Sequence, residues 1–112
     1  MDNIKTDKYY LSKIEQDLEI IIENSKTIKL SKLKIDTPIC DSILFRIIQV
    51  SENAESISTE FKKKFSTIPW REIKGMRNRI VHEYGDVDLE IIKYTITKDI
   101  PVLLKKIKKI KK

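Results

Sequence analysis

One segment of the chain, GMRNRIVHEYGDVD (residues 75–88), gathers side chains that could act on a phosphodiester. It holds the single histidine, His82, five positions after Arg77 and two positions before Tyr84. A histidine can accept and donate protons near pH 7, and an arginine offers a planar set of N–H donors that matches phosphate oxygens. Asn78 adds an amide, so one group could move a proton while others hold charge and position the substrate.

The sequence contains no cluster of Asp, Glu and His typical of a catalytic metal site. The single cysteine, Cys40, excludes an internal disulfide and a cysteine-based zinc site, and it fits a small helical packing residue. We therefore expect no cofactor, and we expect any cleavage to be metal-independent. In RNA the neighbouring 2′-hydroxyl can serve as the nucleophile, so the protein does not need to supply one.

The spacing of these residues conflicts with one regular helix. At about 100° per residue, Arg77 and His82 lie roughly 140° apart, whereas Asn78 and His82 share a face. Either the helix ends near His82, where the letters EYGD would end it, or two copies meet in a two-fold dimer that shares one cleft; of the two we favour the dimer. The spacing alone also fits a purely structural interpretation, in which His82 caps a helix C-terminus and Tyr84 packs.

The elements that must position these residues are helices. The chain has 112 residues, the length of a single domain spanning 1–112, with only two glycines and three prolines. Scarce turn residues and abundant Ile, Leu, Lys and Glu favour a few long helices. We expect an all-α fold, an antiparallel bundle of four to five helices.

Capping signals and apolar periodicity predict where these helices begin and end. The first covers about Thr6 to Lys29. The second begins at Pro38, with Thr37 as its N-cap, and continues to about Phe65. Pro69 opens a third helix, which carries the 75–88 segment. Asp88 caps a fourth helix that Pro101 should kink or divide.

The positive charge is concentrated at the C-terminus. The last eight residues, KKIKKIKK, form a basic tail with six lysines, and the rest of the chain has 17 basic and 17 acidic residues. The tail could attract a polyanion through counterion release, or it could be a solvated helix end. It has too little apolar surface for firm membrane anchoring. No apolar run approaches the roughly 18 residues of a membrane span, so we expect a cytoplasmic protein without a membrane partner.

The sequence around the motif is similar to the HepT-like family of the HEPN superfamily. The pattern that carries the resemblance is Pro-Trp-Arg-x-Ile-x-Gly-Met-Arg-Asn-x4-His-x-Tyr-x3-Asp, from Pro69 to Asp88. An upstream segment, DSILFRIIQVSENAESIS, looks like the family's second helix, with Arg46 and Glu52 in matching places. The resemblance covers about residues 8 to 107 and implies a HEPN-like helical fold.

The resemblance implies a toxin of a type VII-like toxin–antitoxin pair, a homodimeric RNase that cleaves cellular RNA. It assigns catalysis to Arg77 and His82 and places Asn78 and Tyr84 at the substrate. Glu52 could reach the cleft or only pair with a basic side chain, and Arg46 is a candidate RNA or structural contact. The implied partner is a minimal nucleotidyltransferase antitoxin that transfers AMP groups to Tyr84, which would fill the site with negative charge and repel RNA.

The chain departs from the family pattern at three positions. Glu83 and Gly85 flank the tyrosine where the family often has glycine and an aromatic residue, and Ser51 stands where it often has glycine. An alternative function is a non-catalytic HEPN subunit that binds nucleotide or RNA within a nucleotidyltransferase complex.

Overall fold

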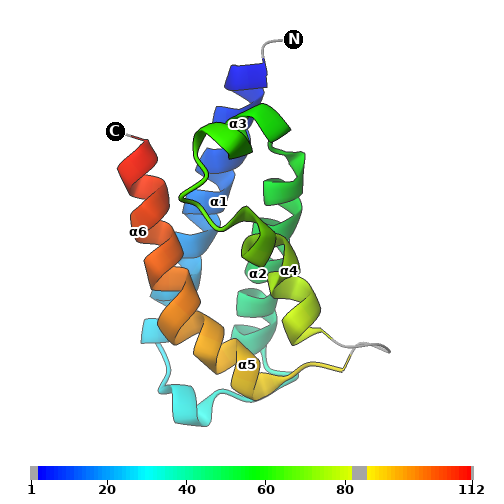
Figure 1. Cartoon of the computed structure of the whole chain (residues 1–112). Coiled ribbons are helices and arrows are strands. Elements are labelled where there is room, and N and C mark those ends of the chain that lie inside the picture. Colours follow the sequence, from blue (N-terminus) through cyan, green and yellow to red (C-terminus); the bar gives the residue numbers. More distant parts are fainter. Residues whose placement is uncertain (1–2, 82–85, 112) are drawn as a thin grey trace.

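The main helices of the protein alternate in direction around one apolar core. In this computed structural model, residues 3–81 and 86–111 are described. In chain order, the elements are α1 (Asn3–Lys26), the 3-10 helix η1 (Leu30–Lys32), α2 (Pro38–Ser56), α3 (Thr59–Lys64), α4 (Trp70–Ile80), α5 (Leu89–Tyr94), the π-helical η3 (Thr95–Asp99) and α6 (Ile100–Ile110). In Figure 1, α1, α2, α4 and the continuous α5–η3–α6 helix alternate in direction, and α3 lies at one end. The expected all-α antiparallel bundle is confirmed.

The core is built from the apolar stripes predicted by helical periodicity. In α1, Leu11, Ile14, Leu18 and Ile21 are at most 3% exposed. Helix α2 packs against both α1 and α4, and α6 packs against α1. Burying each of these side chains contributes roughly 1.5–3 kcal/mol, so the stripes fix which face of each helix remains available for function.

Helix α2 begins as predicted and ends earlier than predicted. Thr37 caps it by accepting a hydrogen bond from the Cys40 N–H at 3.4 Å, and Pro38 lies in the first turn. The prediction that this helix continues to Phe65 is wrong, because α2 ends at Ser56 and the chain extends at Ile57.

The early end of α2 has a physical cause in α1. The Ser58 N–H and hydroxyl donate to the Asp7 carboxylate at 2.8 and 2.6 Å. The same hydroxyl accepts from the Phe61 N–H at 3.2 Å and thereby caps α3. The Asp7 carboxylate therefore divides the expected long helix into α2 and α3 and fixes α3 against α1.

The expected division of the last helix at Pro101 is wrong, because the backbone stays helical from α5 through η3 into α6 and only a π-helical segment before the proline interrupts the α-helical geometry. Asp88 caps α5 through a hydrogen bond to its carboxylate from the Ile91 N–H at 3.1 Å. The π-helical η3 follows, and Pro101 lies in the first turn of α6. Pro101 has no N–H and crowds the preceding turn, while the hydroxyls of Thr95 and Thr97 donate to carbonyls of α5. These hydroxyl bonds accompany the wider turn of a π-helical segment.

Candidate active site

Helix α4 presents Arg77 and Asn78 to solvent. Its buried face consists of Ile73, Met76 and Ile80, which are at most 2% exposed. Arg77 and Asn78 are both exposed, and the Arg77 Nη1 donates to the Asn78 Oδ1 at 3.1 Å. The amide thus orients one edge of the guanidinium and leaves other N–H donors without a partner among the described residues. The outer N–H groups of an arginine held in this way can donate hydrogen bonds to a phosphate group.

Helix α4 ends before the histidine. Its last residue is Ile80, and the Val81 N–H donates to the Arg77 carbonyl at 2.8 Å. Val81 forms an antiparallel bridge with Val87, and the Asp88 N–H donates to the Ile80 carbonyl at 2.9 Å. The chain therefore leaves α4 and returns beside the same end of α4.

His82 and Tyr84 lie outside the described residues, so the structure does not place their side chains. The structure nevertheless agrees with the first alternative raised by the sequence, that the helix ends near His82. Because α4 ends at Ile80, the separation of Arg77 and His82 on a straight helix does not apply. The dimer, which we favoured from the sequence, stays a prediction.

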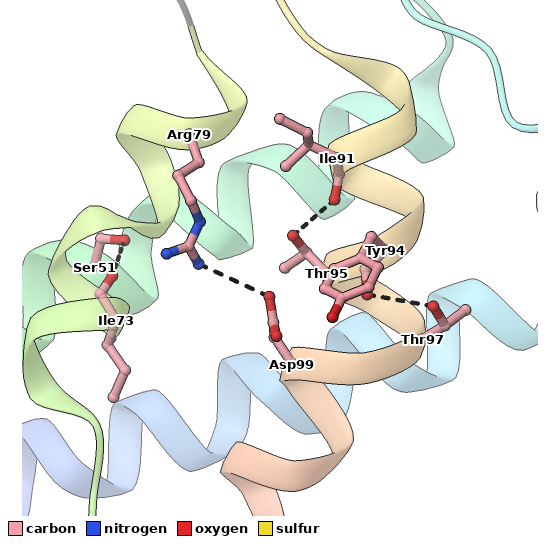
Figure 2. A network of polar contacts seen from close by, with 8 residues as sticks. All are labelled: Ser51, Ile73, Arg79, Ile91, Tyr94, Thr95, Thr97 and Asp99. Carbon is pink, nitrogen blue, oxygen red and sulfur yellow. Dashed lines mark hydrogen bonds and ion pairs between the residues drawn. The ribbon is translucent and has the colours of Figure 1, made fainter.

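Neighbouring elements hold α4 in place. The buried Ser51 hydroxyl donates to the Ile73 carbonyl at 2.8 Å, which joins α2 to α4. On the opposite side, Arg79 Nη2 lies 3.8 Å from Asp99 Oδ2 in η3. Figure 2 shows both contacts, with Ser51 on one side of α4 and Asp99 on the other. The buried Ser51 hydrogen bond therefore joins α4 to α2, while the partly exposed Arg79–Asp99 pair adds little to the position of α4.

A groove of about 740 Å³ separates α4 from the α5–η3–α6 helix. Its charged side chains are those of Glu72, Arg79, Glu90, Lys98 and Asp99. Arg77 and Asn78 do not line it. The groove is therefore distinct from the surface that presents the two predicted site residues.

Glu52 is exposed on α2. It lies three residues before Glu55, whose carboxylate is 3.3 Å from Lys74 of α4. Residues three apart lie on the same side of a helix, so Glu52 is on the part of α2 that borders α4. Both alternatives for Glu52 stay open.

Arg46 is directed toward α1 rather than α4. Its Nη1 donates to Asp17 Oδ1 at 2.8 Å, and the Asp17 side chain is only 5% exposed. Of the two roles raised by the sequence, this position supports the structural one, because a nearly buried carboxylate requires a cationic or hydrogen-bonding partner.

Sequence reasoning missed the contacts of Asp7, Asp17 and Ser51. A signal was present for the two aspartates, because both fall within the apolar stripe of α1, at helical spacing from Leu11 and Ile14. An acidic residue on a buried stripe must find a partner. The partners themselves, Ser58 and Arg46, are 51 and 29 residues away along the chain.

The described residues offer few donors to a metal ion and no reactive thiol. No group of three or more His, Cys, Asp or Glu side chains in ranges 3–81 and 86–111 is arranged to hold one. Burial raises the pKa of the Cys40 thiol above its ordinary value, and the Asp41 and Asp36 carboxylates raise it further. Cys40 is therefore a protonated packing residue at neutral pH.

Comparison with known proteins decides the family. The family model described as Ribonuclease HepT-like matches residues 1–110. The chain belongs to the ribonuclease HepT-like family. A relative from Caldanaerobacter subterraneus subsp. tengcongensis named "Putative RNase TTE0752" is 36% identical over 107 residues, covering 96% of each chain. "Probable ribonuclease HepT" from Thermococcus cleftensis is 30% identical over 108 residues, covering 96% of this chain and 98% of the relative. No solved structure matches the chain significantly.

Membership of the HepT-like family confirms the resemblance drawn from the Pro69-to-Asp88 pattern, and it supports a ribonuclease. The bundle is consistent with a HEPN-like fold. Among the described residues, no helix is both long and apolar enough to span a membrane.

Proposed function

We propose that this HepT-like chain is a metal-independent endoribonuclease that cuts cellular RNA in the cytoplasm. The observation that carries the proposal is the position of Arg77. It is exposed at the last turn of α4, oriented by Asn78, and α4 ends immediately before the segment that contains His82. Family membership supports RNA as the substrate.

The proposed reaction is an internal transesterification. The 2′-hydroxyl oxygen attacks the adjacent phosphorus, the bond from phosphorus to the 5′-oxygen breaks, and the 5′-hydroxyl leaves with a proton. His82 acts as the general acid or base for these proton movements. Arg77 stabilises the negative charge that grows on the phosphoryl oxygens, and Asn78 and Tyr84 position the substrate.

The proposed enzyme is a homodimer with a shared cleft. Phe45, Ile48 and Glu52 occupy one side of α2 at helical spacing, and the adjoining Glu55 pairs with Lys74 of α4. Phe45 is 54% exposed. An exposed aromatic residue on the side of α2 that borders α4 supports a second copy as its partner, since aromatic anchors are enriched in interfaces.

The proposed biological role is the toxin of a type VII-like toxin–antitoxin pair. A minimal nucleotidyltransferase antitoxin would transfer AMP to Tyr84, two residues from His82 in sequence. Each added phosphate would place negative charge beside the cationic site and repel RNA. Intact mass after incubation with ATP and such an antitoxin would reveal the modification, and Tyr84→Phe would prevent it.

The mechanism is tested with an RNA that contains one 2′-deoxy residue at the cut. The all-RNA substrate should be cleaved and should leave a 2′,3′-cyclic phosphate or its hydrolysis product. The 2′-deoxy substrate should resist cleavage at that position, because its nucleophile is missing. Equal cleavage of both would contradict the proposed mechanism. Binding of both without cleavage of either would favour the non-catalytic subunit.

A further inference from the structure

Helices α3 and α6 carry the protein's excess positive charge. Together they contain seven lysines and one acidic residue, Glu60. This surplus equals the formal net charge of the whole chain, +6. The lysines are Lys62, Lys63 and Lys64 on α3 and Lys105, Lys106, Lys108 and Lys109 on α6, which we call the lysine surface.

The two helices lie on either side of a groove at one end of the bundle. Figure 1 shows α3 and the C-terminal turns of α6 at the end where α1 begins, while the last turn of α4 lies toward the other end. A groove of about 530 Å³ lies between α1, α3 and α6. Lys8, Lys64 and Lys111 line it together with the carboxylates of Asp7 and Glu60, and Phe61 and Ile110 are among its apolar residues. Lys106 lies one helical turn before Ile110, which places it on the groove side of α6.

Internal ion pairs do not neutralise the lysine surface. Lys111, just beyond α6, bonds to Glu15 and Ser12 of α1 and fixes the end of α6. Within the described ranges, none of the seven lysines of the lysine surface has a carboxylate partner. Like charges one turn apart on a helix, such as Lys105 and Lys109, destabilise it. A bound polyanion would remove that repulsion.

The apolar face of α6 is already occupied by the core. Ile100, Leu103 and Ile107 are at most 3% exposed. An amphipathic helix binds a lipid surface through an apolar face that enters the membrane. Because α6 has already buried this face, the lysine surface offers mainly charge, which favours a hydrophilic polyanion over a membrane.

We propose that the lysine surface binds the phosphate backbone of the RNA substrate outside the cleavage site. The choice of RNA rests on the proposed function. The lysines release counterions from the strand without reading its sequence, and the adjoining groove admits the strand between α3 and α6. The lysine surface and the last turn of α4, which carries Arg77, lie toward opposite ends of a bundle 43 Å long. Only an RNA long enough to extend from one to the other contacts both.

The test compares three charge-matched variants. The α3 variant changes Lys62, Lys63 and Lys64 to Gln, and the α6 variant changes Lys105, Lys106 and Lys109 to Gln. The control variant changes Lys29, Lys32 and Lys34 to Gln, three exposed lysines in the connection between α1 and α2. Binding of a fluorescent single-stranded RNA is measured by anisotropy across a salt series, after circular dichroism has established equal helicity.

We expect the α3 and α6 variants each to bind about tenfold or more weakly near 0.1 M salt. The slope of log affinity against log salt should fall by about 2 for three lost phosphate contacts on a single strand. The control should retain the wild-type slope. Equal salt slopes in the wild type and all three variants would overturn the inference. Loss of binding to phosphatidylserine vesicles with unchanged RNA binding would also overturn it, in favour of a membrane.

A cleavage assay separates this inference from the proposed function. The α3 variant should cut a short RNA as fast as the wild type and a long RNA with a raised KM and unchanged kcat. If the wild type cuts no RNA while RNA binding still depends on the lysine surface, the proposed function fails and RNA binding by the lysine surface stands. If the wild type cuts RNA and the α3 and α6 variants bind RNA like the control variant, the proposed function stands and this inference fails.

Discussion

At the scale of single residues, Asp17 explains the position of Arg46. The Asp17 carboxylate is almost fully buried between α1 and α2, and Arg46 supplies its charged hydrogen-bond partner. Removing one member of such a pair leaves an uncompensated buried charge. We therefore expect Arg46→Ala to lower the free energy of unfolding by about 2–4 kcal/mol, measured by urea denaturation.

The same variant separates folding from RNA contact. RNA cleavage per folded molecule should be unchanged in Arg46→Ala at a temperature where it remains native. The double variant Asp17→Leu with Arg46→Met should recover much of the lost stability, because it replaces the pair with apolar contacts. Wild-type stability of Arg46→Ala together with slower cleavage would instead make Arg46 an RNA contact.

Residue types together with the family pattern singled out Arg77 and Asn78 as candidate site residues. Both are exposed on α4, as a site requires, and their assignment to the site stays a prediction. The Asp17–Arg46 and Ser51–Ile73 contacts were not predictable, because each joins residues from different helices. Which distant side chains meet depends on how helices pack, and local patterns do not encode that.

At the scale of helical elements, α3 depends on one carboxylate from α1. Asp7 accepts two hydrogen bonds from Ser58 while itself only 3% exposed. We expect Asp7→Ala to lower the free energy of unfolding by about 2–3 kcal/mol in urea denaturation, because a partly buried N–H and hydroxyl of Ser58 lose their acceptor. Asp7→Asn keeps one acceptor oxygen and should cost less.

A double-mutant cycle identifies the contact responsible. The loss caused by Asp7→Ala should be smaller in a Ser58→Ala background, since the hydroxyl bond is then already absent. Additive losses would mean that the two residues do not act through each other, and the account of α3 would be wrong.

Helix starts were more predictable than helix ends. Thr37 and Asp88 cap their helices through side chains close in sequence, so a local pattern reveals them. The end of α2 at Ser56 depends on Asp7, which lies 51 residues before Ser58. The sequence between Ile57 and Phe65 keeps a helical pattern, and only the tertiary hydrogen bonds divide it.

At the scale of the whole molecule, the proposed dimer is tested at Phe45. We expect Phe45→Glu to convert a wild-type dimer into a monomer in light scattering, because a charge would replace the exposed aromatic anchor. RNA cleavage should fall with dimer content. Tyr9→Glu is a matched control, since Tyr9 is 60% exposed on α1, and it should remain dimeric. A wild-type monomer that cleaves RNA at full rate would contradict the dimer.

The most direct test of the central claim is RNA cleavage by the purified protein in EDTA. Intact mass is recorded first, to establish that Tyr84 is unmodified. Wild type and Arg79→Gln should cleave, whereas His82→Ala and Arg77→Ala should be slower by about 10²-fold or more. Arg79 is the matched control, because it lies on the same helix and pairs with Asp99. Cleavage by His82→Ala at the wild-type rate, or wild-type cleavage that stops in EDTA, would contradict a metal-independent site built on Arg77 and His82.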